Sequence, residues 1–378
     1  HLHSLRTSIE CLEQDLQQIR REIDSVVPWL ALTSEPAGRS LDLSAHLRLD
    51  EVPAAARRLA AELETWASAQ RRSGLLSDEL ERSVARLREA FGRGGESAKG
   101  LREELLSLAN RAEREAYAMD FRLLFDHERK LFHIGYNVSA DEADPHYYDL
   151  LASEARLASY FAIIKRDVPE SHWYALGRPM TRAGGGPTLL SWGGTMFEYL
   201  MPSLLMRSRQ GTLLQQSAEF AVDAQIAYGA KNSIPWGISE SAYSRLDAHE
   251  TYQYRSFGVP GLGFKRDLED DLVVAPYASV LAVSIRPKAV ADNVARFNTM
   301  GMGGTWGLFE AIDFHPDSAL GTHKESSTMV RSYMAHHQGM LLVALDNHFN
   351  SQIMVDRFHA EPSINAGEML LNERAPTT

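Results

Sequence analysis

Helical periodicity recurs along almost the whole chain, and this recurrence limits the possible folds more than any other feature. Apolar residues three or four positions apart form the stripes typical of amphipathic helices. Such patterns cover residues 5–26, 51–71, 78–92, 97–118, 146–166, 195–207, 211–230, 272–284, 287–298, 327–346, 349–358 and 363–372. We therefore predict an all-α fold of about twelve helices, which in hairpin pairs close into an (α/α)6 barrel with its loops at one open face.

The first helical pattern has the most regular stripe. Its apolar residues alternate steps of four and three until Pro28 and are Leu5, Ile9, Leu12, Leu16, Ile19, Ile23 and Val26. This stripe is either packed on the chain's own domain or part of a dimerising coiled coil. The first is favoured, because about three heptads are marginal for a free coil. We expect residues 1–45 to form a helical lead-in and residues 46–378 the barrel domain.

Two segments interrupt the helical pattern. Met119–Phe125 and Lys130–Tyr136 flank a polar turn at residues 126–129 and predict a β-hairpin, which we expect to be the only substantial sheet. The glycine-rich run Gly92–Glu96 predicts a break between two helices.

Composition limits the ligand class. The 378 residues carry a formal net charge of -11 without a long basic run, so nucleic acid and anionic membrane surfaces are disfavoured and a neutral ligand fits better. Cys11 is the single cysteine, which excludes an intramolecular disulfide and suits a reducing compartment. No apolar run approaches the roughly 20 residues of a membrane span, and the first residues lack a signal-peptide pattern, so an anchor would lie outside this chain.

Two segments place a glutamate among aromatic residues and glycines. Ser191–Pro202 contains Glu198, and Pro235–Tyr243 contains Glu240. Aromatic faces stack on sugar rings, glycines let a ligand approach the backbone, and a carboxyl group supplies the proton or nucleophile of glycosidic chemistry. These segments predict a carbohydrate-cleaving cleft.

A third carboxyl group belongs with these two. Glu154 lies in an apolar stretch that we expect to be a buried helix, where it is either functional or paired with Arg156 or another basic group. Glu240 is expected to begin a helix, and Glu198 is hard to explain on a surface. Lesser candidates beside aromatic residues are Glu250, Glu310 and Asp313.

Three loops have alternative interpretations. Arg178–Pro187 is a flexible connector, either a lid over the cleft or a plain surface loop. Gly258–Lys265 resembles a phosphate-binding loop but lacks its Gly-Lys-Ser/Thr ending, so a tight turn is favoured. His336 and His337 project about 100° apart on a helix and have no third ligand in sequence, so neither a metal nor another cofactor is expected.

Several blocks in fixed order resemble the middle, glucoamylase-like domain of cyclic β-1,2-glucan synthases. They span residues 119–374 and include Tyr148–Ser159, Met196–Pro202, Trp236–Tyr243, Tyr252–Tyr254, Phe257–Gly263, Ala275–Tyr277, Ala335–Met340 and Asp356–Pro362. The resemblance implies an (α/α)6 barrel that cleaves linear β-1,2-glucan and joins the new end to the chain's own non-reducing end. It also implies a larger synthase, anchored at the cytoplasmic side of the bacterial inner membrane, with a membrane glycosyltransferase domain and a phosphorylase-like domain.

Ring closure exchanges one β-linkage for another, so the resemblance implies retention of configuration and two carboxyl groups. We predict Glu240 as acid/base and Glu154 as nucleophile, with Glu198 orienting the substrate or replacing one of them. Residues predicted to bind substrate are Trp192, Tyr199, Trp236, Tyr243, Tyr252, Tyr254, Trp306, Asp149, Arg156, His337 and Gln338. The alternatives are an inverting endo-β-1,2-glucanase, a non-catalytic glucan-binding module and a structural helical scaffold.

Overall fold

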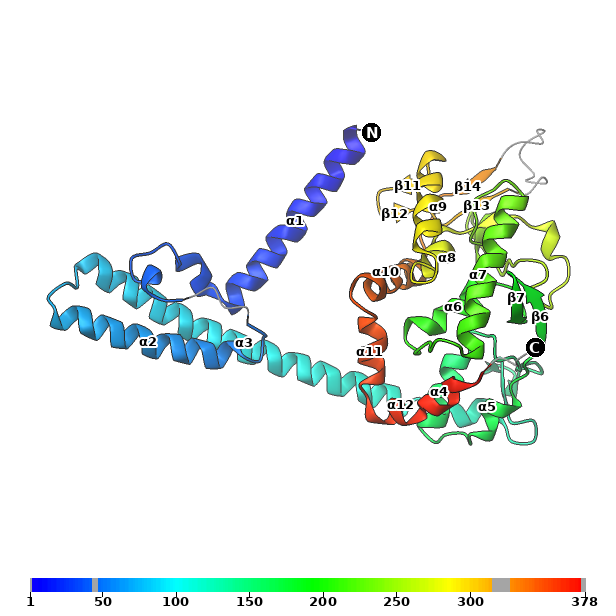
Figure 1. Cartoon of the computed structure of the whole chain (residues 1–378), viewed down its shortest axis with the longest axis horizontal. Coiled ribbons are helices and arrows are strands. Elements are labelled where there is room, and N and C mark those ends of the chain that lie inside the picture. The colour runs from blue at the N-terminus through cyan, green and yellow to red at the C-terminus, as the bar shows by residue number, and fades with distance from the viewer. Residues whose placement is uncertain (1, 43–46, 315–326, 375–378) are drawn as a thin grey trace. The chain divides into compact units, whose positions relative to one another are not determined.

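A computed structural model describes residues 2–42, 47–314 and 327–374 (Figure 1). The chain divides into two compact units, His1–Met119 and Asp120–Thr378. This division lies after Met119, whereas the sequence placed a boundary after residue 45. Where the functional domain begins stays a prediction. Within the described residues, no helix combines the length and the apolar character that crossing a membrane requires.

The first unit consists of long helices around a small core. Its helices are α1 (Leu2–Val26), α2 (Val52–Arg72) and α3 (Asp78–Ala118). The short 3-10 helices η1 (Pro28–Leu32) and η2 (Gly38–Ser40) lie between α1 and α2. Trp29 packs on Phe91 of α3 with ring centroids 5.4 Å apart. The predicted break at Gly92–Glu96 is wrong, because α3 continues through it. A Cβ on Gly94 would lie 2.5 Å from the Trp29 ring, so this glycine serves close packing.

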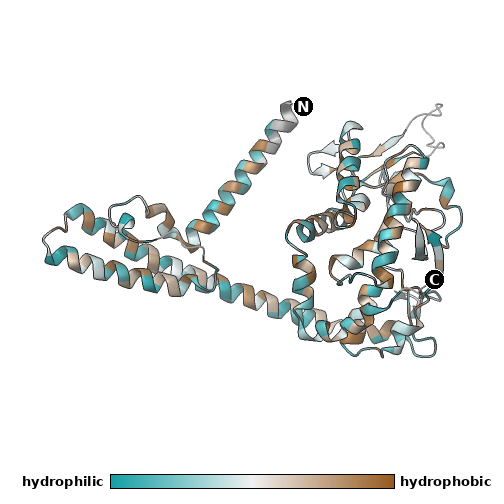
Figure 2. Cartoon of the chain, in the orientation of Figure 1, coloured by the Kyte–Doolittle hydropathy of each residue, from teal (hydrophilic) through white to brown (hydrophobic). Residues whose placement is uncertain are grey.

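The apolar stripe of α1 is solvent-exposed. Apolar residues recur among hydrophilic ones along the helix (Figure 2), and Ile9, Leu12, Leu16, Ile19 and Ile23 are each about half exposed. The favoured expectation, that this stripe packs on the chain's own domain, is therefore not met in the structure. The coiled-coil alternative stays a prediction.

Helices are the longest elements of both units and exceed the strands in total length, which confirms the predicted helical class, while the (α/α)6 barrel itself stays a prediction. The helices of the second unit are α4 (Arg156–Ile164), α5 (Ser171–Ala175), α6 (Met196–Leu200), α7 (Leu213–Lys231), α8 (Pro276–Leu281), α9 (Pro287–Thr299), α10 (Ala335–Phe349), α11 (Ile353–His359) and α12 (Pro362–Ala366). The 3-10 helices are η3 (Phe121–Leu124), η4 (Met201–Leu204), η5 (Leu268–Asp270) and η6 (Gly367–Asn372). Three predicted helices start late, because residues 147–148, 273–274 and 328–330 pair as strands instead.

Besides its helices, the second unit contains short antiparallel strands. The predicted hairpin is confirmed around its turn, in β1 (Phe125–Asp126) and β2 (Leu131–His133), whereas most of its first arm forms η3 instead. Strand β5 (Tyr147–Tyr148) extends the hairpin to three strands. A second three-stranded sheet contains β10 (Val273–Val274), β13 (Ala311–Asp313) and β14 (Thr328–Val330). The expectation of one substantial sheet was therefore wrong. Pairing across distant segments has no local sequence signal.

Four two-stranded ribbons complete the unit. They are β3 (Tyr136–Asn137) with β4 (Glu142–Ala143), β6 (Met180–Ala183) with β7 (Gly186–Leu189), β8 (Ser241–Leu246) with β9 (Tyr252–Arg255), and β11 (Gly303–Gly304) with β12 (Gly307–Leu308). The β6–β7 ribbon replaces the expected flexible connector at 178–187. Gly184 and Gly185 both have positive φ and form its two-residue turn.

Candidate active site

One cavity in the second unit brings the three predicted carboxyl groups together. Its volume is about 690 Å³, and Glu154, Glu198 and Glu240 all line it. Glu154 lies just before α4, Glu198 lies within α6, and Glu240 lies just before β8. The remaining lining residues are Arg129, Leu131, Ile134, Pro145, His146, Tyr147, Tyr148, Asp149, Leu150, Ser153, Trp192 and Ser256. Residues far apart in sequence thus meet at one concave surface.

Glu154 lies in a turn rather than on the predicted helix, since α4 begins only at Arg156. The hydroxyl of Ser153 donates to its carboxylate over 3.2 Å. Burial raises the pKa of Glu154, and the charge of Glu198 raises it further. The carboxyl group is therefore only partly exposed and easier to protonate than a surface glutamate.

Arg156 is a structural residue. Its guanidinium donates to the backbone carbonyls of Ser153, Glu198 and Tyr199 over 2.7–3.0 Å, and the residue is 4% exposed. It thereby ties the Glu154 turn to α6. This corrects the prediction that Arg156 contacts substrate, and its side chain is committed to these carbonyls rather than to an ion pair with Glu154.

Glu198 closes the N-terminus of α6. Thr195 caps the helix by accepting from the Glu198 amide, and the Glu198 carboxylate accepts from the Thr195 amide. The same carboxylate accepts from the Ser191 hydroxyl over 2.9 Å and from the Gly193 amide over 2.8 Å. These three donors tie the Glu198 carboxylate to the Ser191–Thr195 loop, so Glu198 holds this loop against the start of α6.

Glu240 ends a tight loop and precedes strand β8, so the expectation that it begins a helix was wrong. At Gly237 φ is 120°, and a Cβ there would lie 2.4 Å from the Ser279 hydroxyl, so only glycine fits. The Tyr254 hydroxyl donates to Glu240 Oε2 over 3.2 Å. Burial, reinforced by the charges of Glu154 and Glu198, raises the pKa of Glu240 to about 7.

Two glycine segments form one wall beside these acids. Ser191 and Trp192 accept backbone hydrogen bonds from Phe264 and Lys265, and the Val259 amide donates to the Gly194 carbonyl. A Cβ on Gly258 would lie 1.7 Å from the Gly193 carbonyl oxygen. The Gly258–Lys265 loop is therefore a close-packed support for the Trp192 segment.

The predicted substrate-binding residues divide into three sets. Trp192 and Asp149 line the cavity, and Tyr254 reaches it through Glu240. Buried residues outside the cavity lining are Tyr199, Trp236 and His337, besides Arg156. Residues outside the cavity lining are Tyr243, Tyr252, Trp306 and Gln338. The buried set is corrected here to a supporting role, because an aromatic sequence context does not distinguish a core residue from an exposed one.

Several lining residues were missed by the sequence analysis as site residues, among them Tyr148, Arg129 and His146. Tyr148 lies beside the acids, and burial followed by the charges of Glu154 and Glu240 raises its pKa. Arg129 and His146 come from the segments around the β1–β2 hairpin. Tyr148 belongs to the same sequence block as Glu154, which was the available signal. The other two became neighbours only through the sheet.

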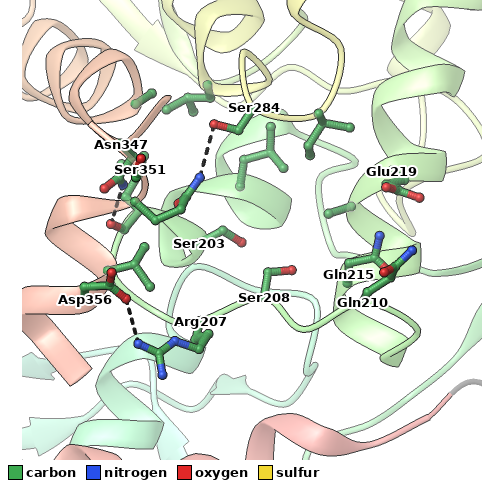
Figure 3. Close-up of a pocket in the computed structure, with 18 residues that line it drawn as sticks. Ser203, Arg207, Ser208, Gln210, Gln215, Glu219, Ser284, Asn347, Ser351 and Asp356 are labelled. Carbon is green, nitrogen blue, oxygen red and sulfur yellow. Dashed lines mark hydrogen bonds and ion pairs between the residues drawn. The ribbon is translucent and has the colours of Figure 1, made fainter. Parts of the chain in front are cut away.

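A second cavity of about 570 Å³ lies between η4, α7, α10 and α11 (Figure 3). Arg207 donates to Asp356 over 2.8 Å across one side, and Ser203, Gln215 and Glu219 line it elsewhere. Its lining residues include no aromatic side chain. It therefore lacks the stacking surface that accompanies the carboxyl groups of the first cavity.

Comparison with known families shows the family to which the chain belongs. The family model described as "Putative glucoamylase" matches residues 146–362, which is more than half of the chain. The chain belongs to this glucoamylase family. The matched residues include Glu154, Glu198 and Glu240, so the family region contains all three acids of the first cavity.

Two relatives of this glucoamylase-family chain illustrate the match. It is 49% identical, over 279 residues, to the cyclic beta-(1,2)-glucan synthase NdvB of Rhizobium meliloti strain 1021; the alignment covers 74% of this chain and 10% of that protein. The chain thus spans about a tenth of the curated relative's length. A crystal structure of a putative glucoamylase from Bacteroides caccae ATCC 43185 is 14% identical, with a TM-score of 0.51, covering 78% of this chain and 66% of that one. This second likeness concerns the fold alone.

Proposed function

We propose that this chain is a glycoside-hydrolase-type enzyme that cleaves linear β-1,2-glucan and rejoins it intramolecularly to cyclic β-1,2-glucan. The 49% identity to a cyclic β-(1,2)-glucan synthase supports the substrate class. The observation that carries the proposal is the cavity in which Glu154 and Glu240 face a shared space beside Trp192. An exposed indole next to two carboxyl groups suits a sugar chain.

The two carboxyl groups differ in the way that retaining chemistry requires. A pKa of about 7 leaves a large fraction of Glu240 protonated at neutral pH, as a general acid needs. Ionised Glu154 contributes to that raised pKa, so one carboxylate keeps the other protonated. Glu154 then attacks the anomeric carbon, and Glu240 protonates the leaving oxygen. In the second step Glu240 accepts a proton from the attacking sugar hydroxyl.

Glu198 has a supporting role in this proposal. Its hydrogen bonds hold the Ser191–Thr195 loop, which carries the Trp192 platform. Its charge also raises the pKa of both Glu154 and Glu240. Asp149, at the cavity rim, supplies a further hydrogen-bonding group for a sugar hydroxyl.

The wider architecture belongs to the same proposal. The second unit is an (α/α)6-type barrel whose open face carries the acids. In the full protein this domain works beside a membrane glycosyltransferase domain and a phosphorylase-like domain, at the cytoplasmic side of the inner membrane. Linear β-1,2-glucan is the substrate and the cyclic glucan is the product.

Incubation of the purified chain with linear β-1,2-glucan tests the function. We expect cyclic products without a matching rise in reducing ends, and product anomers with retained configuration by NMR. Linear products with new reducing ends and inverted anomers would instead identify a hydrolase.

Variants test the roles of the acids. Glu154→Gln and Glu240→Gln should each lower turnover by about 10² to 10⁴-fold, the usual contribution of acid–base groups. Glu128→Gln, in the exposed hairpin turn, is the matched control. Unchanged turnover in both site variants would leave a binding or structural module as the explanation.

A further inference from the structure

A row of four polar side chains runs from the cavity into the protein interior. Glu240 Oε2 lies 3.2 Å from the Tyr254 hydroxyl, which lies 3.2 Å from His337 Nε2. His337 Nδ1 lies 2.9 and 3.1 Å from the two oxygens of Glu310. These groups come from the segment before β8, from β9, from α10 and from the segment before β13. Four separate parts of the chain therefore build one continuous hydrogen-bonded row.

The inner end of the row is sealed from solvent. His337 is 0% exposed and Glu310 is 2% exposed, so neither touches a ligand in the cavity. The Tyr277 ring stacks on His337, with centroids 3.7 Å apart and planes 13° apart. The Tyr277 hydroxyl donates to the Glu240 carbonyl and accepts from the Ser239 hydroxyl, each over 2.9 Å. Burying a carboxylate costs desolvation free energy even when it is paired, so this Glu–His pair needs a reason beyond packing.

Counting protons shows that the row has two complete arrangements. In the first, protonated Glu240 donates to Tyr254, Tyr254 donates to His337 Nε2, and His337 Nδ1–H donates to Glu310. In the second, Tyr254 donates to ionised Glu240, and His337 carries protons on both nitrogens, donating to Tyr254 and Glu310. Both arrangements hold the same number of protons. They differ only in whether the mobile proton is on Glu240 or on His337.

We propose that Tyr254, His337 and Glu310 form a proton relay that sets and restores the protonation of Glu240, which extends the acid/base role proposed above. In the forward direction the Glu240 O–H bond breaks as an O–H bond forms at Tyr254. The original Tyr254 O–H bond then breaks as an N–H bond forms at His337 Nε2. No electrons move and no other reactant is needed. The reverse transfer returns the proton to Glu240 before Glu240 protonates the leaving group, and the attacking sugar hydroxyl supplies the next proton in the second step.

Tyr254, His337 and Glu310 are thus positioning residues. Glu310 orients the imidazole and supplies the negative charge that stabilises its protonated form. Other charged or titratable groups that face Glu240 and His337 are Glu154, Glu198, Tyr148, Tyr277 and His336. These groups also influence the protonation of Glu240. The test therefore replaces only residues of the relay and leaves these groups unchanged.

The test is the pH at which transglycosylation, measured as kcat on linear β-1,2-glucan, falls on the alkaline side. Tyr254→Phe removes a donor to ionised Glu240 and cuts the relay. We expect this alkaline limb to move up by at least about half a pH unit and kcat to fall about ten-fold or more, with KM little changed. Glu310→Gln removes the negative charge that holds the proton on His337, so it lowers the proton affinity of the row and should move the limb down, opposite to Tyr254→Phe.

The double variant Tyr254→Phe/Glu310→Gln separates a relay from simple structural damage. Once Tyr254→Phe has cut the row, Glu310→Gln should produce no further shift. Asp313→Asn is the matched control, because Asp313 is a buried carboxyl of the neighbouring β13 that accepts from Ser244 outside the row. It should leave the alkaline limb in place.

Each outcome bears on one idea. If the shift in the double variant is the sum of the two single shifts, the relay is overturned. An unmoved limb in Tyr254→Phe would overturn it as well. Loss of activity in Glu240→Gln together with an unmoved limb would overturn the relay while keeping the proposed function. Full activity in Glu240→Gln would overturn the proposed function itself. Tyr254 is 42% exposed, so its phenylalanine variant keeps the test usable if the Glu310 variant does not fold.

Discussion

Replacing Glu240 by glutamine should stabilise the folded chain more at pH 8 than at pH 5. The pKa of Glu240 is raised in the folded state, from 4.5 to about 7, chiefly by burial. At pH values below about 4.5 the group is neutral in both the folded and unfolded states. As the pH rises from 4.5 through 7, only the unfolded state ionises freely, so the folded state loses stability. Above pH 7 the penalty is complete.

The structure sets the magnitude. The difference between about 7 and 4.5, at about 1.36 kcal/mol per pH unit, is about 3.4 kcal/mol. Glu240 is only partly buried and solvent screens its charge, so we expect roughly half of this, about 1 to 2 kcal/mol. Glutamine keeps an oxygen that accepts from Tyr254 and introduces no charge.

Urea denaturation at pH 5 and pH 8 measures the effect. The difference in unfolding free energy between Glu240→Gln and wild type should be about 1 to 2 kcal/mol larger at pH 8 than at pH 5. Glu128→Gln, at an exposed site, should show the same difference at both pH values. A pH-independent effect of Glu240→Gln would refute the reasoning, because it would show that this carboxyl ionises alike in both states.

Three further substitutions test the walls of the site. Glu198→Ala leaves the Ser191 hydroxyl and two amides without an acceptor and should lower the free energy of unfolding by about 2 to 4 kcal/mol, measured by urea denaturation; a loss under about 0.5 kcal/mol would contradict the capping role. Trp192→Ala should weaken binding of linear β-1,2-glucan about ten-fold in calorimetry while the melting temperature stays within about 2 °C, because the indole is 65% exposed; unchanged affinity would remove it as a platform. Gly258→Ala should cost at least about 2 kcal/mol in urea denaturation, since its Cβ would meet the Gly193 carbonyl oxygen at 1.7 Å; a neutral result would show that the loop can shift.

Local patterns predicted most of the helices, because a helix is made by contacts three and four residues apart. The pattern at 211–230 corresponds to α7 (Leu213–Lys231), and the pattern at 287–298 corresponds to α9 (Pro287–Thr299). The pattern at 146–166 failed in its first part because β5 pairs with β2, about fifteen residues earlier. Strand pairing of this kind depends on contacts between segments that are separated in sequence, and local periodicity does not reveal such contacts.

The sequence by itself determined the helical class and the three acids, since these depend on residue identity and short spacing. Only the tertiary structure decided what each acid does. Glu198 is held by three donors from its own segment, whereas burial and the charges of Glu154 and Glu198 raise the pKa of Glu240 to about 7. The sequence analysis expected His337 to bind substrate, whereas the structure buries it. Burial and charged neighbours set a group's chemistry, and both are assembled from distant parts of the chain.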